Sequence, residues 1–313
     1  MPLSTTDLLA LLAAIPLAAL GGECFLKGML GLTFWLRLPK FLMATSLAAF
    51  ATSSPELTVS TMAALEGKPE IGLGDALGGN VVNMALILGL ALLFGALPVR
   101  LFELRRDFIL ALFVPILTLM LASDGILSHA DGILLLALFI VWLTLIAKQA
   151  IGHRQKTLLA DTTYTSSVRP IYASLLLLVG LACLLLAGYF FITGASGIAT
   201  AFGVHGYIIG ATLVALGTSL PELVTTLLSR WHGHDDVGLG ILLGSNLFNG
   251  LAIVGVTAII HPIHAPFSKV AVALIFGTLA VLLILPRDNV ISRQRGFGLL
   301  AAYIAYVLLI LMH

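Results

Sequence analysis

The chain has 313 residues and a net charge of +1; 59% of its residues are hydrophobic, 10% are charged, and the mean hydropathy is +1.10. A soluble domain carries about a quarter charged residues, so this composition excludes a soluble globular protein and indicates an integral membrane protein whose partner is the lipid bilayer. The near-zero net charge gives no indication of a nucleic-acid partner. Cys24 and Cys183 both lie in apolar runs, so we expect no disulfide framework.

Ten stretches of the sequence are long and apolar enough to cross a bilayer, which takes about 20 mostly apolar residues. In chain order they are residues 6–32, 40–65, 71–96, 106–123, 130–149, 170–199, 206–230, 236–260, 268–286 and 294–312. Five lie in the first half, residues 1–150, five lie in the second half, residues 170–313, and a polar linker at 151–169 joins them. We therefore predict an all-α membrane protein with ten transmembrane helices.

The first and sixth stretches are rich in glycine at matching places, and small residues let helices approach closely or slide. These two helices are candidates for the moving parts of the protein. Glu23 and Lys27 are four residues apart in the first stretch, a spacing that places opposite charges on one face of a helix. We expect them to form a structural ion pair or Lys27 to extend to the membrane interface, and a role in gating is the alternative.

Two motifs recur along the chain at one fixed distance. ATSSPE, which ends at Glu56, returns as GTSLPE, which ends at Glu222, 166 residues later (222 − 56). Asn83 and Asn249 end the runs GGNVVN and GSNLFN, and they are also 166 residues apart (249 − 83). The shared offset indicates a duplication, and an odd number of helices in each copy makes the second copy enter the membrane from the opposite side. We therefore predict two inverted-topology five-helix repeats.

The positive charges of the loops are concentrated on the side that holds the linker. The other side carries only Lys68 and Lys269. Because cytoplasmic loops are enriched in Lys and Arg, we expect a multi-pass protein of the cytoplasmic membrane, with a cytoplasmic linker and both termini outside. The loops on the cytoplasmic side contain Arg37, Lys40, Arg100, Arg105, Arg106, Lys148, Arg154, Lys156, Arg169, Arg230, Arg287, Arg293 and Arg295.

The first repeated motif places a carboxylate, hydroxyls and a proline inside each apolar half. Pro55 and Pro221 lack an N–H, so we expect them to interrupt their helices and to free carbonyl oxygens upstream. Glu56 and Glu222 each cost at least about 2.5 kcal/mol at mid-membrane, and neither motif contains a Lys or Arg to offset the charge. The oxygen-only donor set favours a hard cation such as Ca²⁺, and the same cage also suits Na⁺ or protons.

The alternative interpretation of each motif is a helix kink with a satisfied buried acid. A single copy would leave the choice open, but packing gives no reason for two copies, each with an Asn 27 residues after its Glu (83 − 56 and 249 − 222). Asn80 and Asn246 stay open between two roles, an ion ligand and a hydrogen bond across helices.

At these motifs the sequence resembles the cation/calcium antiporter superfamily, specifically its prokaryotic sodium/calcium exchanger branch. The signatures of the family are GTSxPE and GSNxxN/D, and the second copy here, residues 217–222 with 244–249, matches them without a gap. The resemblance covers nearly the whole chain. It implies a transporter and not an enzyme, with ten helices in two inverted repeats and ion sites at mid-bilayer.

Carried over by motif position, the ion ligands of the family fall on both copies of the motifs. The resemblance implies that calcium and sodium share the carboxylates of Glu56 and Glu222. The other implied ligands are the Thr52 and Thr218 carbonyls for calcium, the Ala215 carbonyl with Ser219 and Ser245 for one sodium ion, the Ala49 carbonyl with Ser53 for its mirror image, and Asn83 and Asn249 at the border of the central position.

Two positions depart from the family pattern. Gly79 stands where the first repeat of the family usually has Ser, so the mirror-image sodium site lacks a hydroxyl that Ser245 retains. Asn249 stands where potassium-dependent relatives have Asp, which points away from potassium coupling. The large regulatory loop of animal exchangers is also absent, so we expect no calcium-sensing regulation.

We expect a secondary active antiporter that exchanges Ca²⁺ for Na⁺ by alternating access, without a cofactor or an obligatory protein partner. The alternative is a proton-coupled Ca²⁺ antiporter of the same fold, because two carboxylates can trade Ca²⁺ for protons. An ion channel is a third possibility and would show no dependence on a counter-ion. An intramembrane protease also uses buried acids, but it gives no reason for duplicated Ser and Asn residues.

Overall fold

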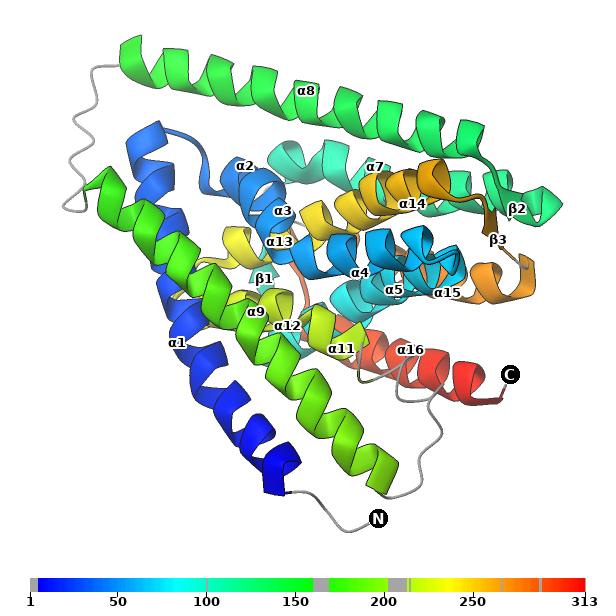
Figure 1. Cartoon of the computed structure of the whole chain (residues 1–313). Helices are drawn as coiled ribbons and strands as arrows, with labels where there is room; N and C mark the ends of the chain where they lie inside the picture. The colour runs from blue at the N-terminus through cyan, green and yellow to red at the C-terminus, as the bar shows by residue number, and fades with distance from the viewer. Residues whose placement is uncertain are drawn as a thin grey trace.

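The computed structural model describes residues 5–99, 101–159, 169–201, 213, 215–265, 267–286 and 289–312. Figure 1 shows that the described chain is a bundle of helices. The helices of the first half are α1 (Thr5–Leu36), α2 (Lys40–Met43), η1 (Ala44–Ala48), α3 (Ala49–Thr52), α4 (Ser54–Leu65), α5 (Pro69–Val81), η2 (Val82–Ile87), α6 (Leu88–Leu93), α7 (Leu101–Leu121), η3 (Ala122–Asp124) and α8 (His129–Leu159).

The second half repeats this order of elements. Its helices are α9 (Pro170–Ala201), α11 (Ala215–Thr218), α12 (Leu220–Trp231), α13 (Asp235–Leu247), η5 (Phe248–Ile253), α14 (Val254–Ile260), α15 (Phe267–Leu283) and α16 (Arg293–Met312). The strands of the described residues are β1 (Leu97–Pro98), β2 (Ile126–Leu127), β3 (Ile263–His264) and β4 (Val290–Ile291), and β1 pairs with β4 and β2 with β3, both antiparallel.

Each predicted transmembrane stretch contains helix in the described residues, although the start of 206–230 lies outside them. Six helical segments of the described chain are long and apolar enough to cross a membrane: Thr5–Leu36, Pro69–Leu93, Leu104–Asp124, His129–Gln155, Pro170–Ile198 and Asp235–Ile260. The prediction of an all-α membrane protein is therefore confirmed. That all ten stretches span the bilayer stays a prediction, because the other four contain shorter, interrupted or less apolar helices.

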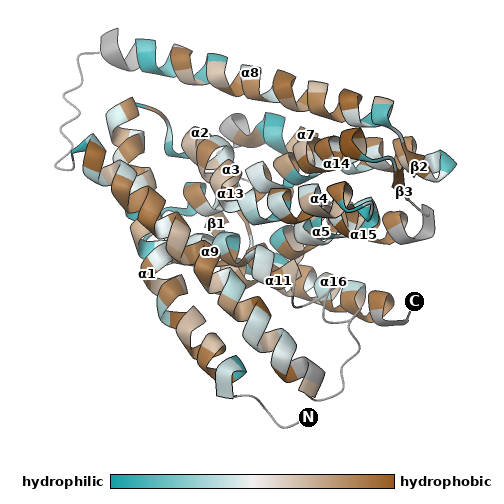
Figure 2. Ribbon diagram, viewed as in Figure 1, coloured by the Kyte–Doolittle hydropathy of each residue, from teal (hydrophilic) through white to brown (hydrophobic). Residues whose placement is uncertain are grey.

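Helices α1, α8 and α9 lie at the outside of the bundle (Figure 1), and Figure 2 shows that most of their residues are hydrophobic. Leu12 and Ile15 on α1 are 63% and 67% exposed, and Ile133 on α8 is 60% exposed. Such a concentration of exposed aliphatic side chains suits contact with lipid. The segments α5–η2 and α13–η5, by contrast, are largely buried and form the centre of the protein.

Helices α1 and α9 lie side by side along much of their length (Figure 1). A Cβ atom on Gly28 of α1 would lie 2.3 Å from the backbone nitrogen of Leu177, and one on Gly180 of α9 would lie 2.3 Å from that of Phe25. Only glycine permits this approach, as expected for the glycine-rich first and sixth stretches. The predicted ion pair on α1 is also confirmed, because Lys27 Nζ lies 2.9 Å from Glu23 Oε1.

Two π-helical segments occupy equivalent places in the two halves of the chain. Val82–Ile87 and Phe248–Ile253 are offset by 166 residues at both ends (248 − 82 and 253 − 87). A π-turn is rare and occurs frequently at functional sites, and each of these segments begins one residue before Asn83 or Asn249. The duplicated sequence therefore folds into the same unusual backbone in both halves.

Candidate cation site

The site is built around two breaks in helical structure. The helix α3 gives way to α4 at Ser53, and α11 gives way to α12 at Ser219; both serines have φ −84° and ψ 11°. Pro55 and Pro221 follow in the first turn of the next helix, where the missing N–H removes no hydrogen bond. The predicted interruption is confirmed, and it falls two residues before each proline.

The serine at each break donates a hydrogen bond to the glutamate of the other repeat. Ser53 Oγ lies 3.1 Å from Glu222 Oε1, and Ser219 Oγ lies 3.2 Å from Glu56 Oε1. Ser245 Oγ on α13 donates a second bond to Glu222 Oε1, at 3.1 Å. The structure thus brings together five residues that the sequence predicts as ion ligands, and each carboxylate belongs to a cage formed by both halves of the chain.

The two glutamates are buried without a positive partner. Glu56 is 1% exposed and Glu222 is 0% exposed. Among the ion pairs that join described residues, none involves either glutamate. The second carboxylate oxygen of each, Oε2, is buried and has no hydrogen-bond partner in the described part of the chain. Since an unpaired buried charge is expensive, these oxygens are strong candidates for ligands of a cation.

The predicted carbonyl ligands lie next to the breaks and keep local hydrogen bonds. The Ala49 carbonyl accepts from the backbone N–H of Ser53 at 2.9 Å and from Thr52 Oγ1 at 3.3 Å. The Ala215 carbonyl accepts from Ser219 N–H at 3.3 Å and from Thr218 Oγ1 at 3.1 Å. These groups are arranged alike in the two halves. Four more of the predicted ligands therefore lie at the two helix breaks: Ala49, Thr52, Ala215 and Thr218.

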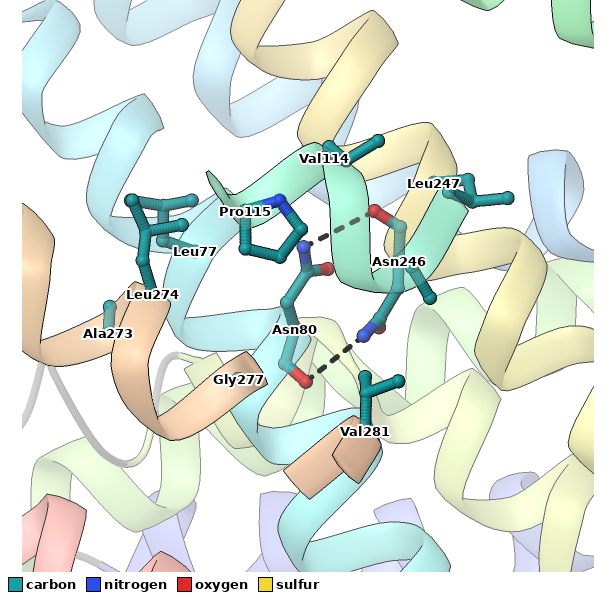
Figure 3. Close-up of a pocket in the computed structure, with 11 residues that line it drawn as sticks. Leu77, Asn80, Val114, Pro115, Asn246, Leu247, Ala273, Leu274, Gly277 and Val281 are labelled. Atoms are coloured by element: carbon teal, nitrogen blue, oxygen red, sulfur yellow. Dashed lines mark hydrogen bonds between the residues drawn. The ribbon is translucent and has the colours of Figure 1, made fainter. Parts of the chain in front are cut away.

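The asparagines fall into two groups. Asn80 Nδ2 donates to the Asn246 carbonyl at 3.2 Å, and Asn246 Nδ2 donates to the Asn80 carbonyl at 3.4 Å. Figure 3 shows these reciprocal bonds beside a small cavity of about 20 Å³ that Pro115 and Val281 also line. Of the two roles left open for this pair, the structure therefore supports the hydrogen bond across helices.

Asn83 and Asn249 are fully buried but differ in their contacts. Asn83 Nδ2 donates to Asn246 Oδ1 at 3.2 Å. Both side-chain polar atoms of Asn249 are buried without a partner among the described residues. A buried amide with neither group satisfied is unusual, and it suits the predicted place of Asn249 at the border of the central position.

The donor set of the site consists of oxygen and amide groups. In the described part of the chain, no group of three or more His, Cys, Asp and Glu side chains could hold a metal ion. A zinc or copper site would use imidazole or thiolate ligands, whereas calcium and sodium accept carboxylate, hydroxyl and carbonyl oxygens. The geometry is therefore suited to a hard cation.

A protein-family model for the sodium/calcium exchanger protein matches residues 6–148 and 172–312 of the chain. The chain belongs to the sodium/calcium exchanger family. The two matched segments correspond to the two halves of the exchanger, and the family resemblance predicted from the motifs is confirmed. The protein is accordingly a cation/Ca²⁺ exchanger, a transporter and not an enzyme.

Relatives of the exchanger match it over most of its length. CaxA of Alkalimonas amylolytica is 32% identical over 94% of this chain and 95% of its own. The inner membrane protein YrbG of Escherichia coli (strain K12) is 34% identical over 72% of this chain and 71% of its own. The solved structure of the sodium-calcium exchanger NCX_Mj soaked with 2.5 mM Na⁺ and 0.1 mM Ca²⁺ has a TM-score of 0.83 and 27% identity, and covers 97% of this chain and 98% of that one.

Gly79 lies at the site, where its missing hydroxyl makes the two halves of the exchanger unequal. A Cβ atom on Gly79 would lie 3.4 Å from Asn249 Nδ2 and 3.6 Å from Ser219 Oγ, which are ordinary contact distances. Ser245, its counterpart, bonds to Glu222. Glu56 Oε1 therefore accepts one serine hydrogen bond, and Glu222 Oε1 accepts two.

The sequence analysis missed one acidic residue beside the site. Thr218 Oγ1 donates to Asp75 Oδ1 at 3.3 Å, and Asp75 Oδ2 is buried without a partner among the described residues. Asp75 lies outside both repeated motifs, and the equivalent position of the second repeat holds Ile241 (75 + 166). Alignment of the two halves beyond the motifs would have revealed an acid in an apolar segment.

Proposed function

We propose that this exchanger moves Ca²⁺ across the cytoplasmic membrane in exchange for Na⁺, by alternating access to one site at mid-bilayer. The observation that carries the proposal is the reciprocal cage of Glu56 and Glu222, each bonded to a serine of the other repeat and each with an unpartnered oxygen. Two carboxylates neutralise one divalent ion, and Ca²⁺ accepts six to eight oxygen ligands in flexible geometry.

The remaining ligands would come from the groups around this pair. Calcium would be held by both glutamates and the carbonyls of Thr52 and Thr218, which are 0% and 3% exposed. Sodium would use the same glutamates with the serines and the Ala49 and Ala215 carbonyls, and Asn83 and Asn249 would border the central position. Because the ions would share the carboxylates, binding of one would exclude the other, which is the requirement for coupled exchange. The relative MaX1 of Methanosarcina acetivorans, 25% identical over 98% of this chain, is named a sodium/calcium exchanger.

Ten transmembrane helices in two inverted repeats would place the pair of glutamates between the two halves. The strand pairs support this topology. Strand β3 is the equivalent of β1 (97 + 166 = 263), yet β1 pairs with β4, which follows β3 in the second half, and β3 pairs with β2. A strand of one half thus meets the non-equivalent strand of the other half, as two copies of opposite orientation require.

The proposed orientation has a cytoplasmic linker and external termini. Single cysteines at Lys68 and at Arg154, in a variant that lacks Cys24 and Cys183, would report it through labelling of intact cells by a membrane-impermeant maleimide. We expect labelling at position 68 and protection at position 154. The reverse pattern would invert the proposed topology.

The function is tested by calcium-45 uptake into proteoliposomes that contain the purified exchanger. An outward sodium gradient should drive uptake, and a pH gradient in sodium-free medium should not. Uptake driven by the pH gradient alone would support the proton-coupled alternative, for which Gly79 provides a reason because it removes a hydroxyl from one sodium site. Uptake that needs neither counter-ion would indicate a channel.

A further inference from the structure

Asp75 is linked to the candidate site through the break between α11 and α12. Its Oδ1 lies 3.3 Å from Oγ1 of Thr218, the last residue of α11, whose single hydroxyl proton is shared between Asp75 and the Ala215 carbonyl at 3.1 Å. The next residue, Ser219, donates to Glu56. Asp75 therefore contacts the residue whose carbonyl is a proposed calcium ligand, on the segment that also supplies a serine to the cage.

The acid has no counterpart in the second repeat. Ile241 occupies the equivalent position on α13, is 0% exposed and lies in an apolar cluster with Phe25 and Ala44. Thr52, the equivalent of Thr218, interacts with its local carbonyl, Ala49, and with the carboxylate of Glu222, and the position equivalent to Asp75 offers it no acid. The contact between Asp75 and Thr218 is thus a property of one half of the site and not of the duplicated set.

Asp75 is a costly residue at this position. It is the seventh of the 13 residues of α5 and so lies away from both helix ends. None of the ion pairs that join described residues includes it. The residue is partly exposed as a whole, but its Oδ2 is buried without a partner. A carboxylate in a membrane-spanning segment is expensive unless it serves an ion or pairs with a charge.

The charge of Asp75 acts on both glutamates of the cage, Glu56 and Glu222. Asp75 then adds a third negative charge near a pair of carboxylates that would by themselves neutralise one calcium ion. A third negative charge nearby attracts every cation, and it attracts a divalent ion with twice the energy of a monovalent one at the same place.

We propose that Asp75 is a specificity-determining and positioning residue of this exchanger, which favours Ca²⁺ over Na⁺ through its charge and holds Thr218 through its hydrogen bond. This inference rests on the proposed function. Asp75 lies four residues before Gly79 on α5, so both face the same side of the helix. The acid adds attraction for cations in the half of the site that lacks a serine hydroxyl.

The other titratable groups on elements that pack against α5 are few. Glu56 lies on α4, Lys269 lies near the start of α15, and His264 on β3 is an exposed side chain. Glu222 lies on α12, the helix that follows α11. Asp235 and Asp236 are at the far end of α13. The proposal therefore rests on the charge and the hydrogen bond of Asp75, and it predicts an effect on ion selectivity at one constant pH.

The test is equilibrium titration of purified wild-type and Asp75→Asn protein with CaCl₂ and, separately, with NaCl, in a potassium-free buffer at pH 7.5. Asn has the same shape as Asp and still accepts the Thr218 hydrogen bond, so the substitution removes mainly the charge. We expect sodium affinity to fall by about threefold and calcium affinity by about tenfold, because the Coulomb energy doubles with the charge of the ion.

Two variants separate charge from structure. Asp75→Glu retains the charge and should retain the wild-type calcium-to-sodium ratio, whereas Glu70→Gln removes an exposed charge from the same helix and should change neither affinity. The proposal would be overturned if Asp75→Asn lowered the calcium affinity and the sodium affinity by the same factor. It would also be overturned if Asp75→Glu changed the calcium-to-sodium affinity ratio as much as Asp75→Asn does. Because the titration measures binding, it decides the role of Asp75 even if calcium uptake in proteoliposomes proves to depend on a different counter-ion.

Discussion

Helices α5 and α13 are equivalent elements of the two repeats, and they bring different groups to the same site. Helix α13 contributes Ser245, which bonds to Glu222, whereas α5 has Gly79 at that position. Helix α5 contributes Asp75, whereas α13 has Ile241. The backbones nevertheless correspond, because both helices continue into π-helical segments of the same length. A duplicated backbone can therefore keep its geometry while the polar groups of the two half-sites diverge.

The largest effect on calcium transport is expected from Glu56 and Glu222, the glutamates that both half-sites retain. Glu56→Gln and Glu222→Gln should each abolish calcium transport, because each removes a charge that the ion needs and that packing does not. Calcium-45 uptake in proteoliposomes measures the loss, and elution of the variants as a single peak in gel filtration checks their fold. Glu70→Gln, an exposed acid on α5, is the matched control. Retained exchange in either glutamine variant would refute a site shared by the two glutamates.

A smaller and unequal effect is expected from the serines at the two helix breaks. Ser219→Ala removes the one serine that donates to Glu56, whereas after Ser53→Ala the carboxylate of Glu222 keeps its bond from Ser245. A hydrogen bond to a charged group contributes about 1.5–3 kcal/mol, so Ser219→Ala should weaken sodium activation by about tenfold or more. Ser53→Ala should have a smaller effect. Equal losses in sodium-dependent uptake would show that the half-sites are equivalent.

Ser245→Ala removes from α13 the hydroxyl that α5 lacks at Gly79. The hydroxyl is a proposed sodium ligand and is not among the proposed calcium ligands. We expect sodium to compete a few-fold less well against calcium-45 uptake, while the half-saturating calcium concentration changes little. A loss of calcium affinity that matches or exceeds the loss of sodium affinity would contradict this assignment.

Gly79→Ser makes the reciprocal change and should produce the smallest effect. A Cβ atom at this position would lie 3.4 Å from Asn249 Nδ2, so the first side-chain atom of the serine fits without a clash. A well-placed neutral oxygen contributes about 0.5–1.5 kcal/mol, so sodium should compete a few-fold better against calcium-45 uptake. If Gly79→Ser leaves sodium competition unchanged while Ser245→Ala abolishes it, then the α5 half-site does not bind sodium.

The sequence was sufficient to predict the helical fold and the pairing of the two motifs. Composition gives the membrane class, and the constant offset between Glu56 and Glu222 predicts that two distant segments serve one site. The cross-repeat bonds from Ser53 and Ser219 follow from that duplication. The helix breaks lie two residues before Pro55 and Pro221, as the missing N–H of proline favours, although Pro16 and Pro115 lie inside α1 and α7.

Other features of the site depend on tertiary contacts that a motif does not contain. Asp75 belongs to no repeated pattern, and its role appears only when Thr218 lies within hydrogen-bond distance. The two roles of Asn80 could be separated only by the arrangement that pairs it with Asn246. The π-helical segments have no strong signal in the sequence, because they depend on how the helix packs and not on the identity of one residue.

The central claim is that calcium and sodium compete for the same pair of glutamates, and equilibrium calcium titration at a series of sodium concentrations tests it most directly. A shared site predicts that sodium raises the apparent Kd for calcium without changing the number of calcium ions bound, with a steeper than linear dependence because more than one sodium ion replaces one calcium ion. An apparent Kd that is independent of sodium would contradict the shared site.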